Sequence, residues 1–362
     1  MQRGPVHTGL TADPNANPHP LLDAWCVTVA ASRAERKGGI AGDNESTLRR
    51  RSTRLLTGST EVDMLIDEIR RTPAKVLTEE QREAYWKNGY LLLERLIPEE
   101  WLERLRAATA EMVERSRALT VSDRIFDLEP DHTAAEPRLR RVTSPVDQHP
   151  DYWAYARESL LADVAADLVG PDVAFHHSKL NFKWARGGAE VKWHQDIQYW
   201  PHTNYTPLTF GTYLYDCGME QGPLGVLPGS HEGPLYDLYG DDGAWAGALS
   251  DRDAAGLDVA RTVYLPGPAG SVTIHNCRTA HHSAANDSPI GRPLLLNVYK
   301  AADALPYTAN PLPSSHAEEV VRGERARWAH HDPRPCLIPP DWSGGYTSLF
   351  ALQQKESAPA SM

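Results

Sequence analysis

Three places in the sequence pair a histidine with an aspartate two residues later, a spacing that lets an imidazole and a carboxylate bind one metal ion. The pairs are His149/Asp151, His194/Asp196 and His330/Asp332. On a β-strand, residues i and i+2 project to the same face, so a strand would direct both side chains to the same ion. Pro150 interrupts the first pair and Pro333 follows the last, and proline disfavours the interior of a sheet. Only residues 190–197 have the pattern of a strand, which favours His194 and Asp196 as metal ligands.

A second histidine would complete a facial triad. Two histidines and one carboxylate on one face of a ferrous ion leave three coordination positions open for other ligands. The candidates downstream are His202, His231, His275, His281 and His282. His231 ends a Pro-Gly-Ser-His turn, where packing in the turn is the simpler role, and His275 ends a predicted strand and could face either way. From the residues alone, the choice among them stays open.

The composition of the chain limits the classes of function that it can have. The chain has 362 residues, with 37 Lys and Arg against 48 Asp and Glu, a formal net charge of −11. Such an acidic chain lacks the positive surface that binds phosphate backbones, so nucleic acid is not expected as the main partner. No apolar run approaches the roughly 20 residues of a membrane helix. The four cysteines show no zinc spacing, which predicts reduced thiols and a cytoplasmic location (Cys26, Cys217, Cys277 and Cys336).

The first half of the chain predicts a tail followed by helices. Residues 1–60 are rich in Arg, Gly, Asn, Ser and Thr without periodicity, which predicts a mobile N-terminal tail. The segment 78–81, Thr-Glu-Glu-Gln, has the form of a capping box that begins a helix. A second helix should begin at Pro98, and a third should span about 157–169 and stop at the following Gly-Pro.

From Val173 onward the pattern changes to short strands separated by Gly and Pro turns. The strand-like runs lie at about 173–184, 190–198, 208–216, 224–227, 262–265, 271–275 and 293–299. Helices followed by many short strands predict a mainly β domain, a sandwich or barrel with flanking helices. We expect the folded domain to span residues 61–310, with its β core from about 173. The segment 311–362 should be an irregular C-terminal extension packed on that domain.

An ordered set of motifs resembles the phytanoyl-CoA dioxygenase family. The motifs are Trp193-His194-Gln195-Asp196, the run Gly222 to His231 that ends in Pro-Gly-Ser-His, His281-His282-Ser283-Ala284-Ala285-Asn286, and Arg292. The family has the order HxD, PGSH, HxSxxN and Arg, with the arginine 11 residues after the distal iron histidine. Arg292 lies 11 residues after His281, so the resemblance implies His281 as the third ligand. The likeness covers about residues 78–305.

The resemblance implies both a fold and a chemistry. It implies a double-stranded β-helix core, the jelly-roll of cupin-like proteins, and a dioxygenase that uses Fe(II), 2-oxoglutarate and O2. Arg292 and Ser283 would hold the far carboxylate of 2-oxoglutarate, because a guanidinium binds a carboxylate through two parallel hydrogen bonds. An aspartate at position 196 argues against a halogenase, whose relatives replace this carboxylate with a small residue.

The strand before the HxD motif has two interpretations. One face of residues 175–183 carries His177, Lys179, Asn181 and Lys183, and this face either is solvated on an edge strand or forms a polar inner wall. The stretch 178–181 resembles the corresponding segment of ectoine hydroxylases, members of the same family. By that likeness Asn181 and Lys179 would contact 2-oxoglutarate. Trp200 would contact the substrate, by a local WHxDxxxW resemblance. Further pocket candidates are Gln198, Tyr199 and Tyr213.

The predicted activity is hydroxylation of an unactivated C–H bond in a small metabolite or natural-product intermediate, with release of succinate and CO2. The same cofactors could instead give desaturation, epimerisation or ring formation. A jelly-roll module that binds a small molecule or metal without turnover is an alternative of another class. A zinc hydrolase is a third, disfavoured because the chain has no HExxH motif. The segment 124–141 could be a lid over the site or an ordinary surface loop.

Overall fold

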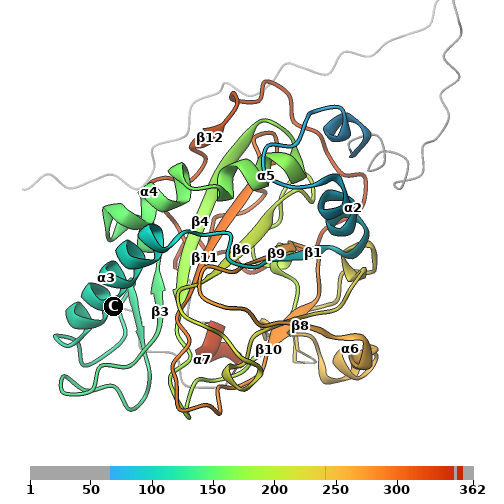
Figure 1. The fold of residues 1–362 in the computed structure, drawn as a ribbon. Helices are drawn as coiled ribbons and strands as arrows, with labels where there is room; N and C mark the ends of the chain where they lie inside the picture. The colour runs from blue at the N-terminus through green and yellow to red at the C-terminus, as the bar shows by residue number, and fades with distance from the viewer. Residues whose placement is uncertain (1–65, 241, 346–348, 354–362) are drawn as a thin grey trace, which may run out of the picture. The chain divides into compact units, whose positions relative to one another are not determined.

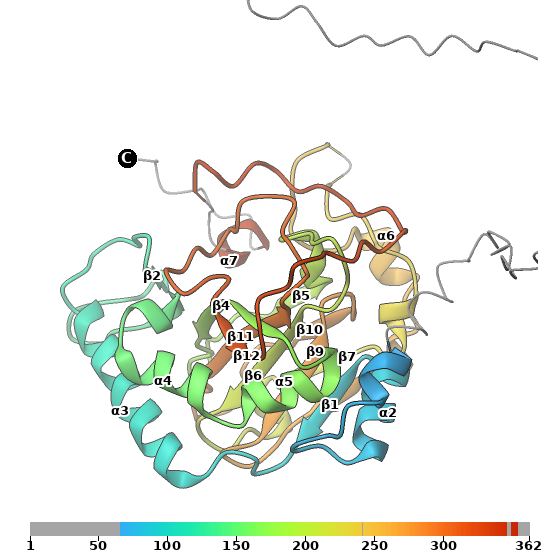
Figure 2. The same cartoon turned by 90° about the horizontal axis from the view of Figure 1, so that it is seen from above.

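The computed structural model describes residues 66–240, 242–345 and 349–353. The predicted tail, residues 1–60, lies outside the described residues. Figures 1 and 2 show two β-sheets, with the larger one covered by helices on one side. Within the described ranges, no helix has both the length and the apolar composition needed to cross a bilayer. The domain limits at residues 61 and 310 stay predictions.

The larger sheet has eight strands, and all of its strand pairs are antiparallel. Its order is β1-β9-β6-β11-β4-β3-β2, with β12 also paired to β4. The strands are β1 (Tyr90–Leu93), β2 (Phe126–Leu128), β3 (Leu139–Thr143), β4 (Val173–Asn181), β6 (Leu208–Tyr213), β9 (Val272–Asn276), β11 (Leu294–Ala301) and β12 (Val320–Arg322).

The smaller sheet has four antiparallel strands in the order β5-β10-β7-β8. They are β5 (Val191–His194), β7 (Leu224–Val226), β8 (Val263–Leu265) and β10 (His281–Ser283). Successive strands along the chain alternate between the two sheets, from β4 to β5, β6, β7 and again from β9 to β10 to β11. This alternation is that of a jelly-roll, which confirms the predicted mainly β fold with a double-stranded β-helix core.

Four of the helices cover the outer face of the larger sheet (Figure 2). The helices are α2 (Glu79–Asn88), α3 (Glu99–Ser116), α4 (Pro150–Glu158), α5 (Leu161–Val169), α6 (Asp251–Ala255) and α7 (Leu349–Gln353), and the 3-10 turns are η1 (Pro145–Asp147), η2 (Asp196–Gln198), η3 (Met219–Gln221), η4 (Ser230–Glu232) and η5 (Val259–Arg261). Side chains of α2 to α5 share one hydrophobic core with the sheet. The inner face of the sheet is therefore left for the site.

The predicted starts of the first two helices are confirmed, but the third predicted helix is interrupted in the structure. The capping box is present: Thr78 Oγ1 accepts from Gln81 N at 3.3 Å, and Gln81 Oε1 accepts from Thr78 N at 2.9 Å. The single helix expected over 157–169 was wrong. Two helices, α4 and α5, replace it, because Ser159 takes an extended conformation with φ −75° and ψ 176°.

Each of the seven predicted strand runs contains a strand, but three features differ. The run 190–198 is a strand only to His194, after which η2 begins at Asp196. The segment 124–141, considered as a lid or loop, contributes β2 and the first part of β3, an antiparallel pair that extends the larger sheet. The short strand β10 was not predicted.

The segment after residue 310 contacts the β core at several places. β12 pairs with β4, and Asp332 N donates to Thr203 O at 2.7 Å. Trp342 Nε1 donates to Tyr199 O at 2.9 Å. The helix α7 is held by the amide of Gln353, which accepts from Lys192 N at 2.9 Å and donates to Gly247 O at 2.7 Å. The extension thus contains regular elements besides its irregular stretches.

Gly222 ends the turn η3 just before β7, and it packs against the backbone that follows β10. It has φ +63°, and a Cβ there would lie 2.2 Å from Ala284 O, just after β10. We expect Gly222→Ala to destabilise the protein by more than the roughly 1–2 kcal/mol of left-handed strain alone, because the backbone after β10 must also move. Gly229→Ala is the matched control: φ is +75° there, but nothing lies within 4 Å. Urea denaturation measures the free energy of unfolding of both variants. An equal loss of unfolding free energy in Gly222→Ala and Gly229→Ala would contradict this account.

Candidate metal centre

The smaller sheet and the turn after β5 bring His194, Asp196 and His281 together. His194 ends β5 and His281 begins β10, and the two are direct partners in the antiparallel register. Their rings lie 4.1 Å apart between centroids. One potential ligand atom from each of the three residues lies within 4.8 Å of the others, and all three residues are buried. The chain thus presents two imidazoles and one carboxylate at a single point.

Backbone contacts fix the tautomer of both histidines. Nδ1 of His194 lies 2.8 Å from Lys192 O, and Nδ1 of His281 lies 2.9 Å from Thr279 O. A carbonyl oxygen only accepts hydrogen bonds, so each Nδ1 carries the proton and each Nε2 keeps a lone pair. The two Nε2 atoms lie 3.7 and 3.9 Å from Asp196 Oδ1. Both lone pairs are therefore available to a metal beside that oxygen.

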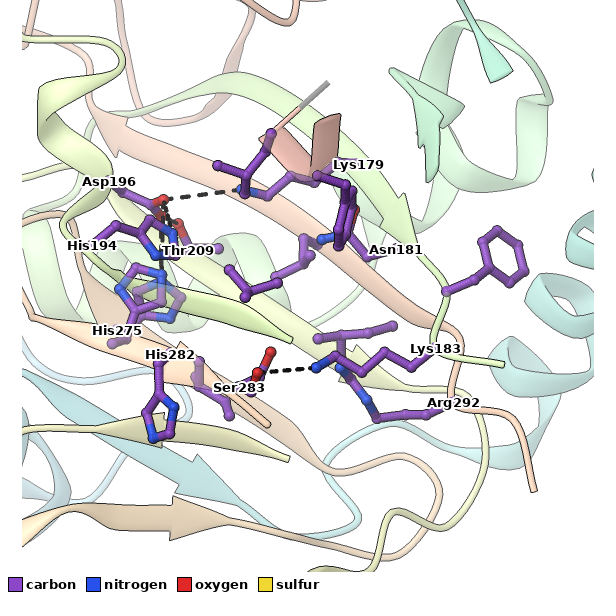
Figure 3. Close-up of a pocket in the computed structure, with 18 residues that line it drawn as sticks. Lys179, Asn181, Lys183, His194, Asp196, Thr209, His275, His282, Ser283 and Arg292 are labelled. Carbon is purple, nitrogen blue, oxygen red and sulfur yellow. Dashed lines mark hydrogen bonds and ion pairs between the residues drawn. The ribbon is translucent and has the colours of Figure 1, made fainter. Parts of the chain in front are cut away.

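The second oxygen of Asp196 is anchored away from this point. Thr209 Oγ1 donates to Asp196 Oδ2 at 2.8 Å, and His275 Nε2 lies 3.3 Å from the same oxygen. Strands β6 and β9 supply these two residues, so the larger sheet orients a carboxylate that the smaller sheet's loop carries. Figure 3 shows Thr209 and His275 beside Asp196 and His194. The arrangement leaves Oδ1 as the oxygen that can bind a metal.

The protonation states suit metal binding. Burial lowers the pKa of His194 to about 4 and lowers that of His281 well below its usual value, so both rings are neutral at pH 7. Burial alone would raise the pKa of Asp196, but Lys179 and the neighbouring histidines outweigh it and lower that pKa. A neutral imidazole and an ionised carboxylate are the forms that bind metals.

The other two HxD pairs have structural roles. His149 caps the start of α4, where its side chain accepts from Asp151 N. His330 Nδ1 lies 2.6 Å from Asp303 Oδ2, so this histidine pairs with an acid other than Asp332. The turn residue His231 contacts Trp86 O at 3.0 Å, and the ring of His282 stacks on Trp193 at 4.2 Å. Within the described ranges, His194, Asp196 and His281 form the one group of His, Cys, Asp or Glu residues able to hold a metal ion.

A cavity of about 60 Å³ lies beside the three residues and is lined by all four residues proposed for 2-oxoglutarate. These are Lys179, Asn181, Ser283 and Arg292. In Figure 3, Arg292 and Lys183 lie at the opposite end of the cavity from Asp196. Main-chain hydrogen bonds between Arg292 and Lys183, at 2.7 and 3.1 Å, hold this end together.

The surroundings of Arg292 indicate whether the cavity is suited to bind a dicarboxylate. Its side chain is 4% exposed, and Nε and Nη1 have no hydrogen-bond partner in the part of the chain that the structure describes. A buried unpaired guanidinium is costly unless a ligand neutralises it. Lys183, by contrast, donates to Ser283 O at 3.1 Å and to Ala284 O, and burial lowers its pKa to about 6. Arg292 therefore fits a carboxylate at this end of the cavity.

The inner face of β4 is a polar wall of the cavity. β4 lies between β3 and β11, so it is not the solvated edge strand that the sequence left possible. Lys179 Nζ lies 4.0 Å from Asp196 Oδ1, and Asn181 lines the cavity beside it.

None of the four candidate substrate residues lines this cavity. The turn η2 directs Gln198 to Tyr236 O and the Tyr199 hydroxyl to Gly247 O. Trp200 packs against His176 at 5.3 Å, and the Tyr213 hydroxyl donates to Leu265 O at 2.8 Å. The structure thus gives no support to these substrate assignments.

Several cavity residues were not assigned to the site from the sequence, among them Thr209, His275, Leu349 and Phe350. His275 was considered as a metal ligand. Its place at the end of a predicted strand was the one sequence feature that could have indicated its contact with the site. Thr209 had no such signal. Leu349 and Phe350 reach the cavity from α7, near the C-terminal end of the chain, and no local pattern could reveal that contact.

The anchoring of Asp196 gives a testable prediction. We expect Thr209→Val and His275→Phe each to weaken Fe(II) binding by about 10- to 100-fold, because the carboxylate loses a donor that orients it. His275→Gln keeps a donor and should recover part of the loss. The measurement is equilibrium dialysis of the apoprotein against Fe(II) without oxygen. Thr273→Val is the control, since Thr273 lies on the same strand face but bonds to Gly211 O. Wild-type affinity in both variants would show that Oδ2 needs no anchor.

Comparison with known proteins agrees with this geometry. Residues 85–294 match the family described as Phytanoyl-CoA dioxygenase (PhyH). A probable alpha-ketoglutarate-dependent hypophosphite dioxygenase of Stutzerimonas stutzeri is 33% identical over 234 residues, which cover 64% of this chain and 81% of that protein. An ectoine dioxygenase of Bordetella parapertussis is 28% identical over 260 residues, covering 66% of this chain and 79% of the relative.

A solved structure shares the fold. The crystal structure of EctD from S. alaskensis with 2-oxoglutarate and 5-hydroxyectoine superposes with a TM-score of 0.54 at 26% identity. The match covers 70% of this chain and 87% of that one.

Proposed function

Because the chain belongs to the phytanoyl-CoA dioxygenase family, we propose that it is an Fe(II)- and 2-oxoglutarate-dependent dioxygenase that oxidises a small molecule. His194, Asp196 and His281 would hold the iron. The observation that carries the proposal is one cavity that joins this group to the unpaired Arg292. A metal site alone would fit many proteins, but a buried guanidinium at the far end calls for a second, anionic ligand.

The polar residues near the metal centre and Arg292 have separate roles in this reaction. The two histidines present neutral Nε2 lone pairs, and Thr209 and His275 hold Asp196 so that one oxygen faces the metal. Arg292 and Ser283 would bind the distal carboxylate of 2-oxoglutarate, with Asn181 and Lys179 along its length. When bound, iron supplies the activation of O2 that couples decarboxylation of 2-oxoglutarate to substrate oxidation. The surrounding apolar side chains, Leu294 and Leu296 among them, exclude water.

We expect hydroxylation of an unactivated C–H bond as the outcome, with succinate and CO2 as coproducts. Relatives named for hypophosphite and ectoine support a small polar substrate. Desaturation, epimerisation or ring formation would use the same residues and stays an alternative. A binding module without turnover is disfavoured, since it has no need of both an open metal face and an unpaired arginine.

The test is succinate formation by protein reconstituted with Fe(II), 2-oxoglutarate and air. We expect slow release of succinate even without substrate, dependent on all three additions, and faster release with a substrate of the right class. Replacing iron by zinc should stop the release. Zinc-supported hydrolysis of a substrate panel, with no succinate under any condition, would overturn the proposal in favour of a hydrolase.

A further inference from the structure

Arg141 on β3 lies next to the cavity on its inner side. It is the direct partner of Asn181 in the β3–β4 register, and partners in such a register share one face of the sheet. Arg141 Nε donates to Asn181 Oδ1 at 3.0 Å, and its Cζ lies 5.3 Å from the centroid of the Phe350 ring. Both contacts, Asn181 and Phe350, line the cavity. Arg141 is thus one side chain removed from the site.

Arg141 is buried and has no ion-pair partner among the described residues. The residue is 3% exposed. Two other polar groups on the same face of β4 are under-satisfied. Lys179 has Asp196 at 4.0 Å as its ionic partner, and the buried His177 Nε2 has no hydrogen-bond partner in the described part of the chain.

The loaded site would carry an excess of positive charge. Asp196 is the one acid among the residues that line the cavity. Lys179, Arg141 and Arg292 contribute three positive charges and Fe(II) two, whereas Asp196 and the 2-oxoglutarate dianion remove three. Two positive charges remain, whichever cation pairs with the cosubstrate. Lys183 is left out of this count because burial lowers its pKa to about 6, so its amino group is mostly neutral at pH 7. Unbalanced charge in a buried site favours an anionic ligand.

We propose that the substrate carries an anionic oxygen group, a carboxylate or a phosphonate, which Arg141 binds beside Asn181. The inference rests on the proposed function and names the class of its substrate. Binding would replace the contact between the guanidinium and the Phe350 ring with charge-assisted hydrogen bonds, which are stronger. The anion would hold the substrate at the β3–β4 side of the cavity, leaving the rest of the molecule to face the metal.

The test is calorimetric titration of the anaerobic protein loaded with Fe(II) and 2-oxoglutarate. The probes are methylphosphonate, acetate and acetamide, the neutral counterpart of acetate. We expect saturable binding of at least one anion, about 10-fold or more tighter than acetamide, and Arg141→Gln should weaken it by about 10- to 100-fold. Arg141→Lys keeps the positive charge but lacks the planar guanidinium. Its affinity for the anion should therefore lie between those of the wild type and Arg141→Gln. Which anion binds more tightly distinguishes a carboxylate from a phosphonate substrate.

Arg138→Gln is the matched control. It removes the same charge just before β3, but Arg138 is partly exposed and pairs with Asp131 at 2.9 Å, so anion binding should persist. Phe350→Ala uncovers the guanidinium and should bind the anion at least as tightly as the wild type.

Equal affinity for acetate and acetamide without binding of methylphosphonate would overturn the inference. Unchanged anion affinity in Arg141→Gln would do the same. The visible charge-transfer band of the iron–2-oxoglutarate complex separates the two claims. If it forms in the wild type while no anion binds, the substrate class is wrong and the proposed function stands; if it never forms, the proposed function itself fails.

Discussion

Replacing His281 by alanine should abolish iron binding and, with it, succinate formation. The variant removes one of three ligands, so the loss of Fe(II) affinity should exceed the roughly 10- to 100-fold that removal of an outer partner costs. Fe(II) affinity from anaerobic dialysis and succinate release from the aerobic reaction are the two measurements.

His282→Ala is the control for this variant. His282 neighbours the ligand in β10, but its ring stacks on Trp193 and points away from Asp196 in Figure 3. This variant should keep its iron. Loss of iron from His282→Ala, with wild-type iron content in His281→Ala, would mean that the wrong histidine has been assigned.

Replacing Arg292 by methionine should weaken 2-oxoglutarate binding and at the same time stabilise the apoprotein. The affinity should fall by about 100-fold or more, since a charged pair with two hydrogen bonds is lost. The apoprotein should gain about 1–3 kcal/mol, because the variant removes a buried guanidinium whose Nε and Nη1 have no partner. Such an exchange of function for stability is common at binding sites. Thermal unfolding with and without 2-oxoglutarate measures both effects.

Lys183→Met gives the opposite expectation for stability. Lys183 lies beside Arg292, but its amino group donates to Ser283 O and Ala284 O. Methionine would leave those carbonyls unpaired, so this apoprotein should be less stable than the wild type.

If Arg292→Met bound 2-oxoglutarate as the wild type does, the cosubstrate would lie elsewhere. If it were also less stable than the wild type, Arg292 would be a structural residue.

The sequence predicted the β core because its strands are short and bounded by Gly and Pro turns. It also selected His194 and Asp196 among three pairs through the positions of Pro150 and Pro333, and the other two pairs do have structural roles. The reason given was only partly right, since Asp196 lies in a 3-10 turn rather than on the strand. The third residue of the group, His281, could be chosen only by resemblance to a family, because β10 is too short to show a pattern.

The features that the sequence missed depend on long-range contacts. The turn η2 follows β5 within the run 190–198 that was predicted as a strand, and none of residues 198–200 lines the cavity. Arg141 lies in a segment that the sequence left as a lid or loop, and its place beside Asn181 depends on the pairing of β3 with β4. Phe350 reaches the cavity from α7, far along the chain. No local periodicity encodes contacts of this kind.

The central claim is that one cavity holds Fe(II) at His194, Asp196 and His281 and 2-oxoglutarate against Arg292. Anaerobic titration of the apoprotein with Fe(II) and 2-oxoglutarate tests it most directly, through the weak visible charge-transfer band of the complex. The account predicts a band that saturates at one equivalent of iron, is absent from His281→Ala, and needs far more 2-oxoglutarate in Arg292→Met. No band in the wild type with both components in excess would contradict it.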